Sequence, residues 1–82
     1  MKIENMRKIN KGTLKAFFDV DLVKVKIKSC KLVQQDGQAA WITGPDEKYE
    51  VNGETKYRKL VEFADKDLQA RILAAALEEY EQ

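Results

Sequence analysis

Alternation of apolar and polar residues is the dominant pattern in the first half of the chain. From Leu14 to Leu22 every second residue is apolar, which is the spacing of a strand with one buried face. A second alternating run, residues 23–28, sets Val23, Val25 and Ile27 against three lysines. Because almost no residues separate the two runs, we expect them to form a tight antiparallel hairpin.

The alternation changes phase close to Lys28 and Ser29. Beyond this point Cys30 and Leu32 are the apolar positions, one residue out of step with Ile27. A one-residue shift would turn every later side chain to the other face of the sheet, so the pattern predicts a β-bulge here. Cys30 falls on an apolar position, which indicates a small buried side chain rather than a nucleophile.

Glycine, proline and asparagine divide the rest of the first sixty residues into short segments. A first strand is predicted over Ile3–Ile9, before a turn at residues 10–12, and a short one over Ala39–Thr43, between the turn at Asp36-Gly37 and the break at Gly44-Pro45. Asn52-Gly53 is a strong hairpin signal. It would join an arm at Tyr49–Val51 to a strand at Lys56–Phe63, with an exposed loop over Asp46–Thr55 as the alternative.

The last segment changes to a helical period. Asp65 suits the N-cap, because its carboxylate can accept from free N–H groups of the first turn, and Asp67 and Arg71 have the spacing of a surface ion pair. We therefore predict an α+β fold, a four- to five-stranded antiparallel sheet with one C-terminal amphipathic helix, as a single domain over residues 1–82. The apolar helix face comprises Leu68, Ile72, Leu73, Ala76, Leu77 and Tyr80.

Composition narrows the possible functions. The chain has 82 residues, no histidine and one cysteine, so catalysis that depends on histidine, histidine-ligated zinc and an intrachain disulfide are all excluded. No apolar run has the length of a membrane span, and residues 1–12 are too polar for a signal peptide. We expect a cytoplasmic protein that is not an enzyme, needs no cofactor and does not contact a membrane.

Charge is distributed unevenly along the chain. Residues 1–34 carry a net charge of +6 and residues 35–82 a net charge of −5, although the whole chain has +1. The two halves could be faces for two different partners. Alternatively, they neutralise each other within the fold or between copies in a dimer.

Lys24, Lys26 and Lys28 form the most prominent charge pattern, followed by Lys31. Lysines at alternate strand positions share a face at a spacing that suits contacts with a nucleic-acid backbone. The competing interpretation is structural, because Asp19 and Asp21 would project from the same face and pair with them across the hairpin.

Aromatic residues also allow two interpretations. Phe17 occupies a polar position beside the lysine face, where it could stack on a base or be covered by a second subunit; the small size of the chain favours the subunit. Trp41, Tyr49 and Tyr57 are expected to be core or interface residues rather than ligand platforms.

The ordered set of segments resembles the SpoVG family of small bacterial proteins. The opening IENMRKINKGTLKAFFDVDL looks like the first hairpin of the family, and VKIKSCKLV looks like its third strand. GQAAWITGP is similar to the turn and apolar strand that end at the family's proline, here Pro45. NGETKYRKLVEF and ARILAAALEEYE match the later strand and the closing helix. The resemblance covers most of the chain.

The resemblance implies a dimeric regulator that binds DNA or RNA and influences septation, sporulation and gene expression, with no enzymatic activity and no cofactor. Lys66 and Arg71, at the start of the helix, match basic positions of the family. The predicted nucleic-acid contacts are therefore these two residues, together with Lys24, Lys26 and Lys28 from the charge pattern alone, and all five would contact the backbone.

Two places depart from the family pattern. Asp46 and Glu47 occupy positions after the proline where the family has a basic stretch. At the start of the helix, Gln69 occupies the position of a family arginine, and Asp65 and Asp67 add negative charge. Fewer phosphate contacts would weaken binding and flatten its salt dependence. The alternative is therefore a protein-interaction module that keeps the fold and has lost the DNA site.

Overall fold

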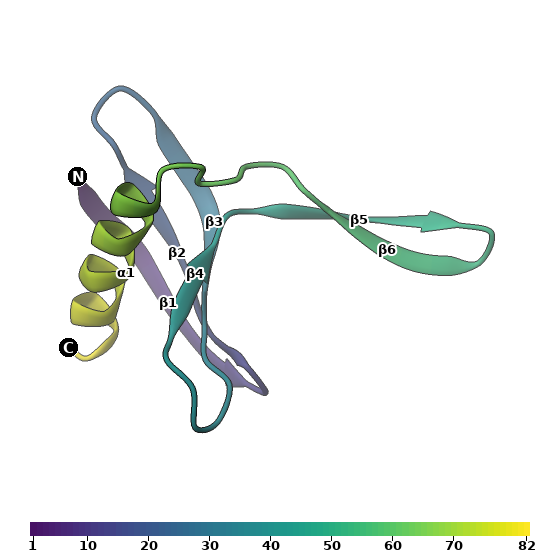
Figure 1. Ribbon diagram of the computed structural model, residues 1–82, viewed down its shortest axis with the longest axis horizontal. Coiled ribbons are helices and arrows are strands. Elements are labelled where there is room, and N and C mark those ends of the chain that lie inside the picture. The colour runs from purple at the N-terminus through teal and green to yellow at the C-terminus, as the bar shows by residue number, and fades with distance from the viewer.

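The computed structural model describes residues 1–82 and contains two antiparallel sheets and one helix. Four strands form one sheet in the order β1-β2-β3-β4, and two further strands form a separate hairpin (Figure 1). The elements are β1 (Lys2–Lys11), β2 (Leu14–Asp21), β3 (Lys26–Val33), β4 (Trp41–Thr43), β5 (Asp46–Val51), β6 (Glu54–Lys59) and α1 (Lys66–Tyr80). The α+β prediction is confirmed, with six strands in two sheets rather than one sheet of four or five.

The β2–β3 hairpin forms, but its turn uses residues that the pattern had assigned to a strand. Leu22 donates its backbone N–H to the carbonyl of Val25 at 2.8 Å, and the carboxylate of Asp21 accepts from the N–H of Val23 at 2.7 Å. Val23 has a left-handed φ of 78° and is 83% exposed. Reversing the chain therefore takes residues 22–25 out of the ladder. The prediction that Val23, Lys24 and Val25 belong to an alternating strand is wrong, because β3 begins at Lys26.

Four register shifts interrupt the sheet, two between β1 and β2 and two between β2 and β3, and two of the four lie beside Asp19. The register of β2 and β3 shifts between the Phe18–Cys30 and Val20–Ile27 pairs, and Ser29 has a φ of 62°, which confirms the bulge predicted at residues 28–29. A second shift between β1 and β2 lies around Asn5, whose φ is 53°. Asparagine tolerates this left-handed conformation better than most residues, but the alternation gave no sign of it.

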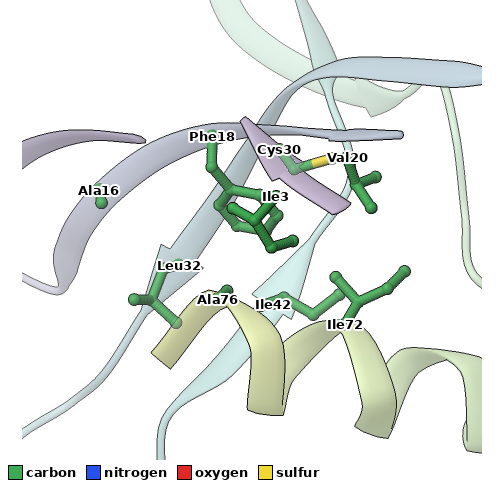
Figure 2. Close-up of a cluster of buried hydrophobic side chains, with 9 residues drawn as sticks. All are labelled: Ile3, Ala16, Phe18, Val20, Cys30, Leu32, Ile42, Ile72 and Ala76. Atoms are coloured by element: carbon green, nitrogen blue, oxygen red, sulfur yellow. The ribbon is translucent and has the colours of Figure 1, made fainter. Parts of the chain in front are cut away.

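The hydrophobic core lies between the sheet and the helix (Figure 2). Residues paired directly across an antiparallel ladder point to the same face, so the pairs Ile3–Val20, Phe18–Cys30 and Leu32–Ile42 place six side chains on one side. α1 covers this side with Ile72 and Ala76. The predicted apolar helix face is confirmed, since Leu68, Leu73, Leu77 and Tyr80 also pack against the core.

Both ends of α1 are fixed. The carboxylate of Asp65 accepts from the N–H groups of Asp67 at 2.9 Å and Leu68 at 3.2 Å, which confirms the predicted N-cap. At the other end, the Tyr80 hydroxyl is hydrogen-bonded to the Asn10 side chain. The helix thus begins near β4, where Gln69 donates to the carbonyl of Ile42 at 3.3 Å, and ends at β1.

The β5–β6 hairpin, which we call the arm, projects away from the helix and from the four-stranded sheet (Figure 1). Its base is held by the Leu60 N–H, which donates to the carbonyl of Pro45 at 2.9 Å, and by close packing of Gly44 on Val61. A Cβ at Gly44 would lie 2.5 Å from the Val61 carbonyl oxygen, so only glycine fits. The hairpin prediction at Asn52-Gly53 is confirmed and the loop alternative is wrong, but β6 ends at Lys59 rather than Phe63.

Candidate nucleic-acid interface

The face of the four-stranded sheet opposite α1 is uncovered, and we call it the open face. Cross-strand pairs define it as three rows. Lys2, Asp21 and Lys26 form one row, and Arg7, Phe17, Lys31 and Thr43 form another. The third row comprises Lys11, Leu14, Val33 and Trp41. Glu4 and Asp19 are paired between the first two rows, beside the bulge that carries Lys28. The open face therefore combines a small excess of positive charge with two aromatic side chains.

The predicted lysines differ in how their charges are compensated. The Nζ atom of Lys26 lies 3.3 Å from a Glu4 oxygen and 3.9 Å from an Asp21 oxygen. The Asp21 contact is the cross-strand pairing expected from the structural interpretation, which is confirmed for Lys26, whereas the closer Glu4 contact, from β1, was not expected. Lys24, in the turn, and Lys28, in the bulge, are exposed and form no ion pair. These two lysines are thus free to contact a polyanion.

Asp19 is the one buried charged residue of the chain, at 5% exposure, and it lies on the open face. Its carboxylate accepts from the Asn5 side chain at 2.8 Å and from the Ser29 N–H at 3.0 Å. Both donors sit at the bulges of the neighbouring strands, where left-handed residues turn them toward β2. These two hydrogen bonds hold the pKa of Asp19 below its usual value of 3.8. Burial raises this pKa, and the positive charges of Arg7 and Lys28 lower it further by a smaller amount.

Arg7 and Lys31 flank Phe17 in the middle row of the open face. The guanidinium of Arg7 lies 6.0 Å from the centre of the Phe17 ring and 3.7 Å from an Asp19 oxygen. The Nζ atom of Lys31 contacts Asp46, at the base of the arm, at 2.9 Å. Phe17 is half-buried by these neighbours within one chain, so its place in the sheet does not require a second subunit to cover it.

Trp41 and Tyr57 are not core residues. Trp41 is 57% exposed and Tyr57 is 64% exposed. Trp41 points away from its buried neighbour Ile42, and alternation around Ile42 is a signal that could have revealed this. Tyr57 lies on the arm opposite Lys48, whereas Tyr49, on the other face of the arm, carries the Arg58 guanidinium 5.0 Å above its ring.

Lys66 and Arg71 are exposed on α1, which covers the opposite face of the sheet from Lys26 and Lys28. The Nε atom of Arg71 lies 3.4 Å from an Asp67 oxygen, as the spacing predicted. Lys66 forms no ion pair. The five predicted contact residues therefore do not form one continuous surface: three lie on or beside the open face and two lie on the helix.

Cys30 is buried, as predicted, and its Sγ lies 3.8 Å from the carbonyl of Ile27. Burial and the negative charge of Asp19 raise the pKa of the thiol to about 11. The side chain is therefore a neutral thiol at physiological pH and a poor nucleophile. No group of three or more cysteine or acidic side chains is arranged as a metal site.

Comparison with protein-family models, with curated proteins and with solved structures finds no match. The single helix, α1, lacks the length and the apolar character that a membrane-spanning helix needs.

Proposed function

We propose that this chain is a SpoVG-like regulator that binds nucleic acid in the cytoplasm through its open face, without enzymatic activity. The observation that carries the proposal is the uncovered sheet face with Lys24 and Lys28 free at one end and the exposed Trp41 at the other. Cations supply sequence-independent attraction to phosphates, and aromatic side chains on a sheet offer surfaces on which bases stack. The resemblance of the segment order to the SpoVG family supports the same function.

Removing the two unpaired lysines should weaken binding and flatten its salt dependence. Each lost phosphate contact lowers the slope of log affinity against log salt by about 0.7 for a single strand, so Lys24→Ala combined with Lys28→Ala should lower it by about 1.4. The measurement is a fluorescence-anisotropy titration of labelled DNA and RNA at several salt concentrations.

Two further double variants locate the site. Lys66→Ala with Arg71→Ala should have a smaller effect, because Asp67 already compensates Arg71. Lys8→Ala with Lys56→Ala removes the same charge elsewhere, since Lys8 lies against Tyr80 on the helix side and Lys56 on the arm; it should change the slope least. A larger loss with the helix pair would move the proposed site to α1.

The second candidate function is a protein-interaction module on the same fold, and the arm favours it. All six residues of β6 are exposed, and a two-stranded hairpin is marginally stable without a partner surface. The same titration separates the two functions, because absence of binding to DNA and RNA at micromolar protein in low salt would favour the module.

We also infer that the regulator is a homodimer. Only 11 of 82 residues are buried, which is a small core for an independent domain. Val51 and Leu60, on the arm and at its base, are exposed apolar side chains that a second copy could cover. Sedimentation velocity at micromolar concentration should give twice the 9.5 kDa chain mass; a 9.5 kDa species alone would contradict the dimer.

A further inference from the structure

A pocket of about 360 Å³ opens at the end of the sheet where β3 leaves the ladder. Its walls come from three segments: Thr13 in the β1–β2 turn, Val33 with the following glutamines, and Trp41 at the start of β4. Val33 and Trp41 belong to the last row of the open face, so the pocket continues that surface. Its volume lies in the range of small-molecule sites.

The lining of this pocket is aromatic and amide-rich, and it contains no charged residue. Gln34 donates its side-chain N–H to the carbonyl of Gln38 at 3.0 Å, which leaves the Gln34 amide oxygen as a free acceptor. The side-chain amides of Gln35 and Gln38 form no hydrogen bond within the chain. Each amide offers both donors and an acceptor, so the pocket presents a flat apolar wall beside neutral hydrogen-bonding groups.

A planar, uncharged ligand with donors and acceptors along its edge matches this lining, and a nucleobase is such a ligand. We propose that the Trp41 pocket receives one unstacked base of single-stranded nucleic acid, with the base on the indole ring and its edge against the glutamine amides. The proposal rests on the proposed function, because the cations of the open face would hold the strand that carries the base.

The neighbouring row of the open face favours a strand over an isolated neutral ligand. Phe17, between Arg7 and Lys31, is the next aromatic side chain along the face. It lies two strands and two residues away from Trp41, which is about 12 Å at ordinary sheet spacings. One base cannot contact both rings, so the arrangement suits successive nucleotides rather than a single sugar or base.

The same geometry favours a single strand of nucleic acid over a duplex as the ligand. Bases within a duplex are stacked on their neighbours and paired along their edges, so neither surface is free to meet Trp41 or the glutamines. Duplex DNA would retain the phosphate contacts of Lys24 and Lys28 and lose the pocket contact. The proposal therefore predicts tighter binding of a single strand than of a duplex at the same salt concentration.

Trp41 is the only tryptophan, so its fluorescence reports on the pocket directly. Titration with a short oligothymidylate should quench this fluorescence to saturation. Neither a duplex of oligothymidylate with oligoadenylate nor an abasic strand of equal length should quench it to the same extent. Equal quenching by the abasic strand would overturn the proposal, because phosphate contacts alone would then explain the signal.

Variants measured with a labelled strand complete the test. Trp41→Ala should weaken binding about 5- to 150-fold, the range for one lost base stack, and Trp41→Phe should retain most of the affinity. Gln38→Ala should weaken binding about 2- to 10-fold, as expected for one hydrogen bond. Tyr57→Ala is the matched control, because Tyr57 is equally exposed but lies on the arm outside the pocket, and it should leave affinity unchanged.

The outcomes separate this proposal from the proposed function. Salt-dependent binding that is unchanged in Trp41→Ala would overturn the base pocket and leave the proposed function standing. Absence of binding to any strand would overturn both. Quenching by a neutral oligosaccharide and not by the strand would overturn the proposal in favour of a sugar site.

Discussion

Replacing Phe18 with alanine should lower the free energy of unfolding by about 3–5 kcal/mol. Phe18 is fully buried in the core, and Figure 2 shows its side chain extending from β2 toward α1. Truncation of a buried phenylalanine costs about 3–5 kcal/mol. A chain of this length has a free energy of unfolding of only about 4–12 kcal/mol, so the variant should lose a quarter of its stability or more. Urea denaturation followed by circular dichroism measures the loss.

Phe17→Ala is the matched control for this variant. Phe17 precedes Phe18 on β2, is the same residue type and points to the open face, where it is only half-buried. We expect its truncation to cost less than half as much as truncation of Phe18. Equal losses would mean that the two faces of β2 are covered alike, which contradicts the described architecture.

Replacing Asp19 with alanine should be the most destabilising change on the open face. The variant loses two hydrogen bonds to a carboxylate, from Asn5 and from the Ser29 backbone. Hydrogen bonds to charged groups contribute about 1.5–3 kcal/mol each, and both bulges lose the group that orients them. Removing the carboxylate also removes the cost of burying it, so we expect a net loss of about 2–4 kcal/mol, measured by urea denaturation at neutral pH. A loss no greater than that of Asp21→Ala, at the end of β2, would contradict this role.

The pH dependence of stability provides a second readout of Asp19. Because the pKa of Asp19 is lower in the folded state, its stabilising contribution is fully present above 3.8. The contribution is lost as the pH falls through the folded-state pKa below that value. Asp19→Asn removes this titration, so its unfolding free energy should fall less steeply with acidification than that of the unchanged protein. Parallel pH profiles would show that Asp19 is not coupled to folding.

The parts of the fold that depend on local pattern could be predicted from the sequence. Alternation over β2 assigns Ala16, Phe18 and Val20 to one face, and all three are buried. The change of phase at Ser29 locates a bulge because a strand cannot change faces without an extra residue. Capping by Asp65 likewise depends only on neighbours within one turn.

Features that depend on how the segments meet in space could not be predicted. The separation of the arm from the four-stranded sheet depends on Gly44, which lets Val61 pack against the backbone. The Asp19 cluster brings together side chains and backbone from three strands, and its geometry depends on two bulges of which the pattern showed one. Val23 was misassigned because apolar turn residues are indistinguishable from strand residues by alternation alone.

The sequence identified which types of residue form the candidate site, but it did not predict how they are arranged in space. The charge pattern identified Lys24, Lys26 and Lys28, but only the register shows that Lys26 is compensated by Glu4 and Asp21. Lys66 and Arg71 lie on α1, and the core and the sheet separate them from these lysines. The pocket beside Trp41 was missed because its glutamines resemble an ordinary polar loop in sequence.

Amide chemical-shift mapping of the isotopically labelled protein, during titration with a single strand, would locate the binding surface directly. We expect saturable shifts that concentrate on the open face, at Arg7, Phe17, Lys28 and Lys31, and in the pocket beside Trp41. Residues 66–80 should shift little, because they cover the other side of the sheet. Shifts that concentrate on residues 66–80 and leave the open face unchanged would show that nucleic acid does not bind there.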